Sequence, residues 1–343
     1  MFQSYDEVTE HLAANIKAMN WWRWKTIFKY ILFVLFLPLC VIVPIMITTN
    51  MGEVAQAVGR FSIFFLFLFD IVFLINSKRK FQWKYKELIV KRMVKELIET
   101  CELPEKYPGS SLRWTYDSEK AISGRRTAKS GLFIIEKGDR VLGRDKISGK
   151  IGLTRFSLSV TKLFREKSRH KRRLRSGRRR RRKKYKQKFR GILFLADFNK
   201  YFKGHTLLRD KHIRSFSHLK RYFWRVFARW ASGNDLRRIE MENPDFNHKF
   251  KTKTSNEIEA RYILTPNFME KLIAFRKRRR KPIDISFKAN KVGMAVSSKR
   301  GHFKASIFRF MKHGQVKEVY EDLIFFFTII EELDLNTRIW SKN

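Results

Sequence analysis

The fold of this chain is decided by two apolar runs, YILFVLFLPLCVIVPIMI at residues 30–47 and FSIFFLFLFDIVFLI at residues 61–75. The first run contains no charged residue and the second contains one, Asp70. A helix needs about 20 apolar residues, each rising about 1.5 Å, to cross a bilayer core. With their flanks the runs reach that length. We therefore expect a two-helix transmembrane hairpin over residues 26–76, with spans at 26–48 and 58–76.

Charge on the two sides of this hairpin predicts its orientation. Basic residues precede the first span and follow the second: Lys17, Arg23, Lys25, Lys29, Lys78, Arg79, Lys80, Lys84 and Lys86. The connecting loop contributes Arg60 as its only basic residue. Because Lys and Arg accumulate on the cytoplasmic side, both termini should be cytoplasmic. Trp21, Trp22 and Trp24 before the first span, with Trp83 and Tyr85 after the second, are typical of interfacial anchors.

The apolar runs fit a soluble core or a signal peptide less well than they fit a hairpin. Core segments of a large soluble protein would not need flanking tryptophans and a charge asymmetry. A cleaved signal peptide would place its cleavage site, Ala55-Gln56-Ala57, too far beyond an over-long apolar region that contains Pro38 and Pro44.

Asp70 has two interpretations as the intramembrane polar residue. It marks ion passage or a helix contact, or it is a hydrated or paired carboxylate near the end of its span, which we favour.

The rest of the chain has the pattern of a mostly antiparallel α+β domain at residues 105–343, reached through a connecting helix at 77–104 and preceded by an N-terminal cytoplasmic helix within 1–25. Strands are expected over 132–136, 150–162, 191–198, 237–250 and 259–264, and a strand hairpin over 282–296 that turns at Ala289. Thr265-Pro266 predicts the start of a helix that ends near residue 281. Residues 316–333 predict a C-terminal core helix.

Composition adds an extreme positive charge. The 343 residues include 75 Lys and Arg against 32 Asp and Glu, a formal net charge of +43, which favours anionic partners such as lipid headgroups or nucleic acid. Two cysteines, Cys40 and Cys101, cannot form a disulfide framework and fit a reducing compartment. Residues 165–190, within a predicted basic insert at 163–190, hold 17 basic residues and one acid.

We name the densest part of this insert the basic segment, and it is the candidate anionic-surface site. Its residues are Arg172, Arg173, Arg175, Arg178, Arg179, Arg180, Arg181, Arg182, Lys183 and Lys184. A solvated disordered loop, contact with the anionic cytoplasmic leaflet, and nucleic-acid binding all fit this composition. Tethering by the hairpin favours the lipid interpretation, and only Tyr185 and Phe189 could stack on bases.

A second candidate surface lies at residues 216–230. Phe216, Leu219, Phe223, Phe227 and Trp230 share one face of a predicted helix whose other side is basic. That pattern is typical of a helix lying on a membrane surface, and equally of a helix packed on a soluble core.

Catalytic and metal-binding patterns are absent from the sequence. The glycines at 138 and 143 have the spacing of a phosphate-binding loop, but Arg144 and Asp145 follow where Lys and Ser or Thr are needed. No zinc-type Cys or His spacing and no nucleophile elbow occurs. We therefore expect no cofactor and no metal, and we favour a non-enzyme over an enzyme.

Four stretches resemble the bacterial family called "domain of unknown function 3137". They are DKISGKIGLTRFSLS at 145–159, GILFLADFNKYFKGHT at 191–206, EIEARYILTPNFMEKL at 257–272 and LDLNTRIW at 333–340. They occur in the family's order between about residues 82 and 340. The resemblance implies a membrane-tethered cytoplasmic domain in the bacterial inner membrane, and it brings no established activity. The basic segment and the 216–230 helix lie between the motifs as additions of this member.

The sequence leaves three hypotheses for the function of this chain. The first is an anchored cytoplasmic scaffold or adaptor whose basic segment contacts anionic lipid, with protein partners unknown. The second is a membrane-tethered, non-specific nucleic-acid binder. The third is an enzyme with an unrecognised site, for which Asp197, Asn199, Glu259, Arg261 and Arg338 are the nominees, although structural roles in caps, turns and ion pairs are the better expectation for them.

Overall fold

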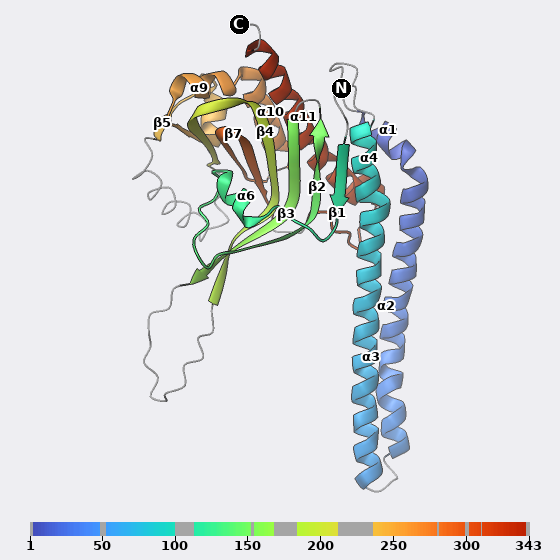
Figure 1. Cartoon of the computed structure of the whole chain (residues 1–343). Helices are drawn as coiled ribbons and strands as arrows, with labels where there is room; N and C mark the ends of the chain where they lie inside the picture. Colours follow the sequence, from blue (N-terminus) through green and yellow to red (C-terminus); the bar gives the residue numbers. More distant parts are fainter. Residues whose placement is uncertain are drawn as a thin grey trace, which may run out of the picture. The chain divides into compact units, whose positions relative to one another are not determined.

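The computed structural model describes residues 3–48, 53–99, 113–151, 154–167, 184–211, 236–279, 281–298, 302–309 and 311–340. They fall into two compact units. The helical unit comprises residues 3–100 and 303–322, and the sheet unit comprises residues 1–2, 101–302 and 323–343. Figure 1 labels helices and strands of both units.

Two long helices dominate the helical unit. Helix α1 (Tyr5–His11) opens with a capping box, in which Ser4 Oγ accepts from Glu7 N–H and Glu7 Oε2 accepts from Ser4 N–H. Helices α2 (Ala13–Thr48) and α3 (Glu53–Tyr85) lie antiparallel and side by side (Figure 1). Lys84 Nζ lies 5.6 Å from the ring centroid of Trp22, and Lys29 Nζ lies 5.0 Å from that of Phe73, which fixes the pairing of the two helices.

The predicted spans 26–48 and 58–76 lie inside these two helices. The helical hairpin is therefore present. Within the part of the chain that the structure describes, however, no helix combines the length and the apolar content that crossing a membrane requires. The transmembrane assignment of the hairpin is unsupported there.

The chain continues from α3 as one helical path. The π-helix η1 (Lys86–Lys91) and helix α4 (Arg92–Glu99) follow without a break. The apolar face of this connecting helix is fully buried, and it consists of Val90, Val94, Leu97 and Ile98. The unit is completed by η2 (Met311–Val316) and the first turns of α11 (Lys317–Trp340).

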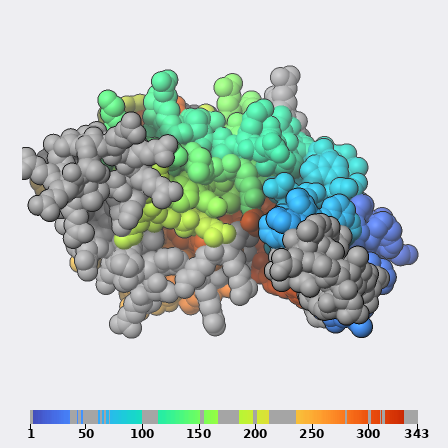
Figure 2. Space-filling model, turned by 90° about the horizontal axis from the view of Figure 1, so that it is seen from below, coloured from blue at the N-terminus to red at the C-terminus, as the bar shows by residue number. Residues whose placement is uncertain are grey.

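The sheet unit is built on a seven-stranded, fully antiparallel sheet in the order β1-β2-β3-β4-β6-β5, with β7 paired to β4. The strands are β1 (Arg113–Asp117), β2 (Arg140–Ile151), β3 (Thr154–Lys167), β4 (Lys184–Asp210), β5 (Arg237–Ile239), β6 (Phe250–Thr254) and β7 (Ile283–Ser297). In Figure 2 the green residues, which belong to β1–β3 and to the segment between β1 and β2, form a continuous surface on the side seen from below.

Strand β4 is the centre of this sheet. It is 27 residues long, and its first half pairs with β3 while its last five residues pair with β6. Its other edge pairs with β7 along most of its length, from Gly191↔Ser297 to Arg209↔Asp284, with register shifts between Asp197 and His205. A long strand can hold several partners in this way because each backbone edge offers its own row of donors and acceptors.

Helices α10 (Pro266–Arg279) and α11 cover one face of the sheet through aromatic contacts. Ring centroids are 5.1 Å apart for Phe194 and Phe326, and 5.6 Å apart for Phe156 and Phe327. The predicted C-terminal core helix is confirmed, since Phe326, Phe327 and Ile330 are buried.

The opposite face of the sheet is covered by α6 (Gly124–Lys129) and the segment after it. A buried cluster there joins this segment to β3, β4 and β7: Ile122, Leu132, Phe133, Leu163, Phe189, Leu193, Leu195 and Ala295. The predicted mixed α+β class with an antiparallel sheet is confirmed.

Four local predictions are wrong. Residues 237–250 form no continuous strand, because Asn243 caps the helix α8 (Pro244–Lys249), which separates β5 from β6. Residues 132–136 form no strand, and Leu132 and Phe133 instead fill the cluster under the sheet. Residues 259–264 lie mostly in α9 (Glu257–Ile263), which Asn256 caps, instead of a strand. Residues 282–296 form the single strand β7 instead of a hairpin. Ala289, where the sequence predicts the turn, has φ +52° and lies within this one strand, which bends there.

Candidate membrane-facing and anion-binding surfaces

Indoles and amines gather at the end of the helical hairpin that lies away from its connecting loop. We name this group the Trp–Lys collar, and it consists of Trp21, Trp22, Trp24, Trp83, Lys25 and Lys84. Lys25 Nζ lies 4.7 Å from the centroid of Trp21 and 5.6 Å from that of Trp22. Lys84 Nζ lies 5.0 Å from the centroid of Trp83 as well as near Trp22. An ammonium over an indole face is attracted by the ring quadrupole, which keeps cations and aromatics at one level of the hairpin.

Beyond the collar, the described side chains of α2 and α3 expose large apolar surfaces. The exposed fractions reach 63% for Phe28, 65% for Leu35 and 69% for Phe69. Further exposed apolar residues on these two helices are Ile31, Leu32, Val34, Ile42, Met46, Phe61, Phe64, Phe65, Leu68, Val72, Phe73 and Ile75. Contiguous apolar patches of this kind mark a surface that contacts something other than water.

The basic segment lies between two paired strands. Residues 168–183 fall outside the described residues, so the structure does not test Arg172, Arg173, Arg175 or Arg178 to Lys183 as a site. Lys184 begins β4, opposite Lys167 at the end of β3. Both ends of the predicted insert 163–190 are thus strand, and the basic segment is the connection of the β3–β4 hairpin.

The stem of this hairpin is fastened to a turn at residues 136–139. The Asp139 carboxylate, 2% exposed, accepts from Glu166 N–H at 3.2 Å and Glu136 N–H at 3.1 Å. Arg165 pairs with the same carboxylate at 3.4 Å. The Arg140 guanidinium lies 4.4 Å from the ring centroid of Tyr185. These contacts fix the two strands from which the basic segment departs.

The other predicted site residues lie apart. Residues 212–235 are outside the described residues, so the helix carrying Phe216, Leu219, Phe223, Phe227 and Trp230 is untested. Asp70 lies in α3, and its side chain is not among those described.

A row of cations that sequence analysis did not single out crosses β5 and β6 and reaches the residue after β4. This cation row consists of Arg238, Lys251, Lys253 and Lys211. Lys253 of β6 pairs directly with Arg238 of β5. Lys251 lies two residues before Lys253 on the same face of β6, where the lysines alternate with buried residues. Burial lowers the pKa of both lysines. Repulsion from Arg238 and Lys211 lowers the pKa of Lys251 further, and Lys251 does the same to Lys253.

A buried polar cluster lies on the same face of the sheet. His205 Nε2 and Ser286 Oγ are 2.9 Å apart, and Arg209 pairs with Asp284 at 2.8 Å. Burial, then repulsion from Lys288 and Arg209, lowers the pKa of His205 to about 3. Burial raises the pKa of Asp284, although Arg209 opposes that shift. Ser286 is fully buried, so no substrate reaches this His–Ser pair and its role is structural.

The enzyme nominees also have structural roles where they are described. The Glu259 carboxylate accepts from the backbone N–H groups of Lys203 at 3.0 Å and Gly204 at 2.8 Å. The Arg261 guanidinium pairs with Glu257 at 2.6 Å on the exposed face of α9. Asp197 lies in β4 opposite Lys291. Asn199 and Arg338 lie in β4 and α11, and their side chains are outside the description.

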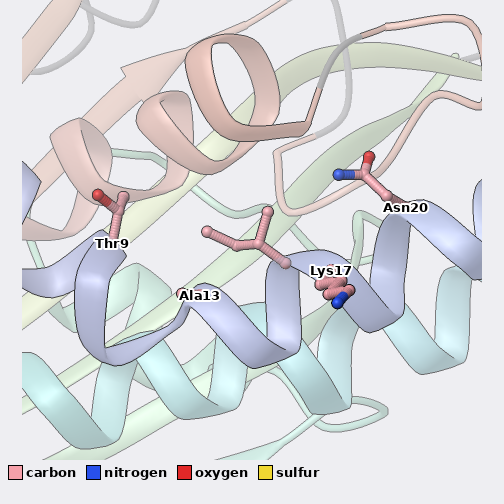
Figure 3. Close-up of a pocket in the computed structure, with 5 residues that line it drawn as sticks. Thr9, Ala13, Lys17 and Asn20 are labelled. Carbon is pink, nitrogen blue, oxygen red and sulfur yellow. The ribbon is translucent and has the colours of Figure 1, made fainter.

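The described residues offer no metal cluster as a reaction centre. No group of three or more His, Cys, Asp or Glu side chains there could hold a metal ion. A hollow of about 240 Å³ runs along one side of α1 and α2, lined by Thr9, Ala13, Ile16, Lys17 and Asn20 (Figure 3). One amine and two neutral polar groups give this hollow no acid–base pair and no nucleophile.

Together these features define an antiparallel α+β domain joined to a two-helix hairpin, with cationic surfaces and no catalytic constellation in the residues described. Residues 187–335 match the family model "Protein of unknown function (DUF3137)". The match runs from β4 into α11 and confirms the resemblance predicted from the sequence motifs. The motif at 145–159 lies before it.

Comparison with solved structures gives one distant likeness, the crystal structure of the mycobacterial trehalose monomycolate transport factor A, TtfA. The TM-score is 0.27 and the sequence identity 10%, over 62% of this chain and 86% of that chain. A likeness of this degree carries no argument about fold or function. No match was found among curated proteins.

Proposed function

We propose that this protein is a membrane-anchored, non-enzymatic scaffold or adaptor whose cytoplasmic α+β domain is held beside anionic lipid. The hairpin is the anchor. The observation that carries the proposal is the succession, along α2 and α3, from the Trp–Lys collar to exposed apolar side chains such as Phe28, Leu35 and Phe69. Indoles and lysines at headgroup level, followed by apolar side chains at acyl level, are the pattern of a membrane interface.

Length also supports the anchor. The 36 residues of α2 and the 33 of α3 rise about 50 Å each, which exceeds a hydrocarbon core of about 30 Å. The apolar runs 30–47 and 61–75 supply the span on each helix. The residues with described side chains do not by themselves contain a spanning helix, so this part of the proposal depends on the sequence.

The location follows from charge. Both termini lie on the cytoplasmic side of a bacterial inner membrane, because the basic residues flank the hairpin and not its loop. The basic segment then lies in the compartment bounded by the anionic leaflet. Each Lys or Arg near such a surface contributes about 1 kcal/mol, so a few of its ten cations are enough to hold the segment there.

The anchor is tested by expressing the full chain, isolating membranes and washing them at alkaline pH. We expect the protein to stay with the lipid. Release into the wash would overturn the anchor.

Lipid contact is tested separately, by limited trypsin digestion of the full chain in nanodiscs with and without phosphatidylglycerol. We expect cleavage after residues 172–184 to slow several-fold in the anionic discs, and the difference to disappear in 1 M salt, where the screening length is about 3 Å. Cleavage after Arg125 and Arg126 of α6 is the internal control and should not change. Equal rates at the basic segment in both kinds of disc would end the lipid proposal.

A second candidate function is non-specific nucleic-acid binding, which the cation row favours. Arg238, Lys251 and Lys253 lie within one sheet face at the spacing of adjacent strands, and each phosphate that they neutralise releases counterions. Binding of a single-stranded RNA to the nanodisc-embedded chain should fall steeply between 50 and 200 mM salt. Substitution of all three by Gln should flatten that slope. Absence of any RNA binding at 50 mM salt would exclude this candidate.

A further inference from the structure

A short loop near the C-terminal end of the chain is fastened to both helices of the hairpin at the level of the Trp–Lys collar. Gln82 of α3 binds it with both ends of its amide, since Gln82 Nε2 donates to Ala305 O at 2.5 Å and Gln82 Oε1 accepts from Ala305 N–H at 3.2 Å. Arg23 of α2 donates from Nη1 to Arg309 O at 3.1 Å. All these residues belong to the helical unit.

A buried glutamine holds the loop from the inside. Gln315, 3% exposed, donates from Nε2 to Ser306 O at 2.8 Å and to Arg309 O at 2.9 Å, and its Oε1 accepts from Ser306 N–H. Tyr85 OH donates to Gln315 O at 3.3 Å, which ties this arrangement back to the end of α3. A loop with so many backbone groups bound has a defined shape and a fixed tip.

The tip of the loop presents an aromatic side chain to the outside. Phe308 is 81% exposed, the largest exposed fraction of any large hydrophobic side chain among the residues described. Holding a phenyl ring in water is unfavourable, since apolar surface that is exposed to water gains no hydrophobic stabilisation. A rigid loop that nevertheless exposes such a ring therefore indicates an apolar contact for it. The sequence around it, KASIFR at 304–309, carries two cations and no acid, and Arg309 pairs with Glu318 at 2.9 Å.

The level of the loop follows from its two attachment points. Arg23 lies three residues before the first predicted span and Gln82 lies six residues after the second, or about 5 and 9 Å along the helix axes. The headgroup region extends about 5–8 Å beyond the hydrocarbon core on each side. Arg23 therefore lies within the headgroup region and Gln82 at about its outer edge, so the loop is attached at the membrane–water interface, beside the indoles of Trp22, Trp24 and Trp83.

We propose that residues 304–309 form a third membrane contact of this protein, a rigid interfacial loop that inserts Phe308 at the boundary between headgroups and acyl chains. Lys304 lies at the phosphate level, and the cations of the collar continue the same surface. The contact joins the C-terminal part of the chain to the bilayer at the base of the hairpin. This inference rests on the proposed membrane anchor.

The test uses the full chain with Cys40→Ala and Cys101→Ala, and one new cysteine labelled with an environment-sensitive fluorophore. Phe308→Cys places the probe at the loop tip. Glu10→Cys, exposed on α1 of the same helical unit, is the matched control. In phosphatidylcholine–phosphatidylglycerol vesicles we expect the emission at position 308 to shift to the blue, and lipid-borne nitroxides to quench it at least threefold more strongly than at position 10.

Two outcomes separate the loop from the anchor. If the labelled chain fails to float with the vesicles, the anchor proposal falls and the loop proposal falls with it. If the chain floats but the probes at 308 and 10 give the same emission and quenching, the loop proposal alone is overturned. Phe308 is too exposed for its substitution to disturb packing, and an unchanged thermal transition of the variant confirms this.

Discussion

Gly131 lies where the chain passes closest to the buried His205–Ser286 pair. Its φ is +73°, and a Cβ added there would stand 2.7 Å from Ser286 Oγ and 3.0 Å from His205 Nε2. Both the backbone conformation and the contact favour glycine. The pair therefore fixes how the segment after α6 lies on the sheet.

Gly131→Ala should lower the free energy of unfolding by about 1–3 kcal/mol, because it combines strain at positive φ with a steric contact. Thermal unfolding of the full chain in detergent measures the loss. Gly124→Ala is the control, since a Cβ there meets only Val141 at 3.5 Å and lies in a helix. If both variants unfold at the same temperature, the close packing around Gly131 is wrong.

His205 predicts a pH dependence of stability. Its pKa is about 3 in the folded chain against an ordinary 6.5, so below pH 6.5 the unfolded state binds a proton that the folded state does not. Its contribution is complete above pH 6.5 and is lost as the pH falls towards 3. Between pH 7 and 5 the loss should be about 2 kcal/mol.

Hydrogen exchange of β4 and β7 peptides at pH 7 and 5, corrected for intrinsic rates, measures this loss. His205→Gln should show a smaller pH effect than the unmodified chain, whereas His248→Gln, at an exposed position, should not differ from it. An equal pH effect in all three proteins would show that His205 does not cause it.

The ion pair between Arg209 and Asp284 is a second buried feature of this face. Arg209→Met leaves Asp284 buried without its cation and should cost about 3–5 kcal/mol. The double variant Arg209→Met, Asp284→Leu should recover most of that loss, as judged by thermal unfolding. Failure of the second substitution to restore stability would mean that Arg209 acts through its bond to Leu132 O instead.

At the scale of elements, α9 shows what local propensity cannot reveal. Residues 259–264 favour a strand by propensity, because they include the strand formers Tyr262 and Ile263 next to Leu264. The deciding signals are Asn256 as N-cap and Glu259, whose carboxylate binds the backbone of β4 more than 50 residues away. Propensity contains no information on such a distant partner. In contrast, α11 is predictable because its apolar face repeats over many turns.

Glu259→Gln should loosen the bend of β4, because a neutral amide binds the N–H groups of Lys203 and Gly204 less strongly than a carboxylate does. Amides at 202–206 should exchange several-fold faster. Glu257→Gln, which removes only an exposed partner of Arg261, should leave those amides unchanged. Equal exchange in both variants would remove Glu259 from this role.

At the scale of the whole molecule, composition alone predicts cationic surfaces but not where they are. The 17 basic residues of 165–190 are adjacent in sequence and easy to see. Arg238, Lys251 and Lys253 come together only through strand pairing, and the loop at 304–309 reaches the hairpin through Gln82 and Arg23, more than 200 residues away. Contacts between distant residues have no local pattern, so only the fold shows them.

The length and central place of β4 have a consequence for synthesis. Its partner β7 ends almost 90 residues after β4 does, so at 5–20 residues per second the ribosome delivers that partner roughly 4–18 s later. The helical hairpin is synthesised first and can contact lipid during this interval. Over the same interval one edge of β4 has no strand paired to it. We expect nascent chains stalled near residue 245, about as far beyond the end of β4 as residue 330 lies beyond the end of β7, to be bound by chaperones, and chains stalled beyond residue 330 to be free of them.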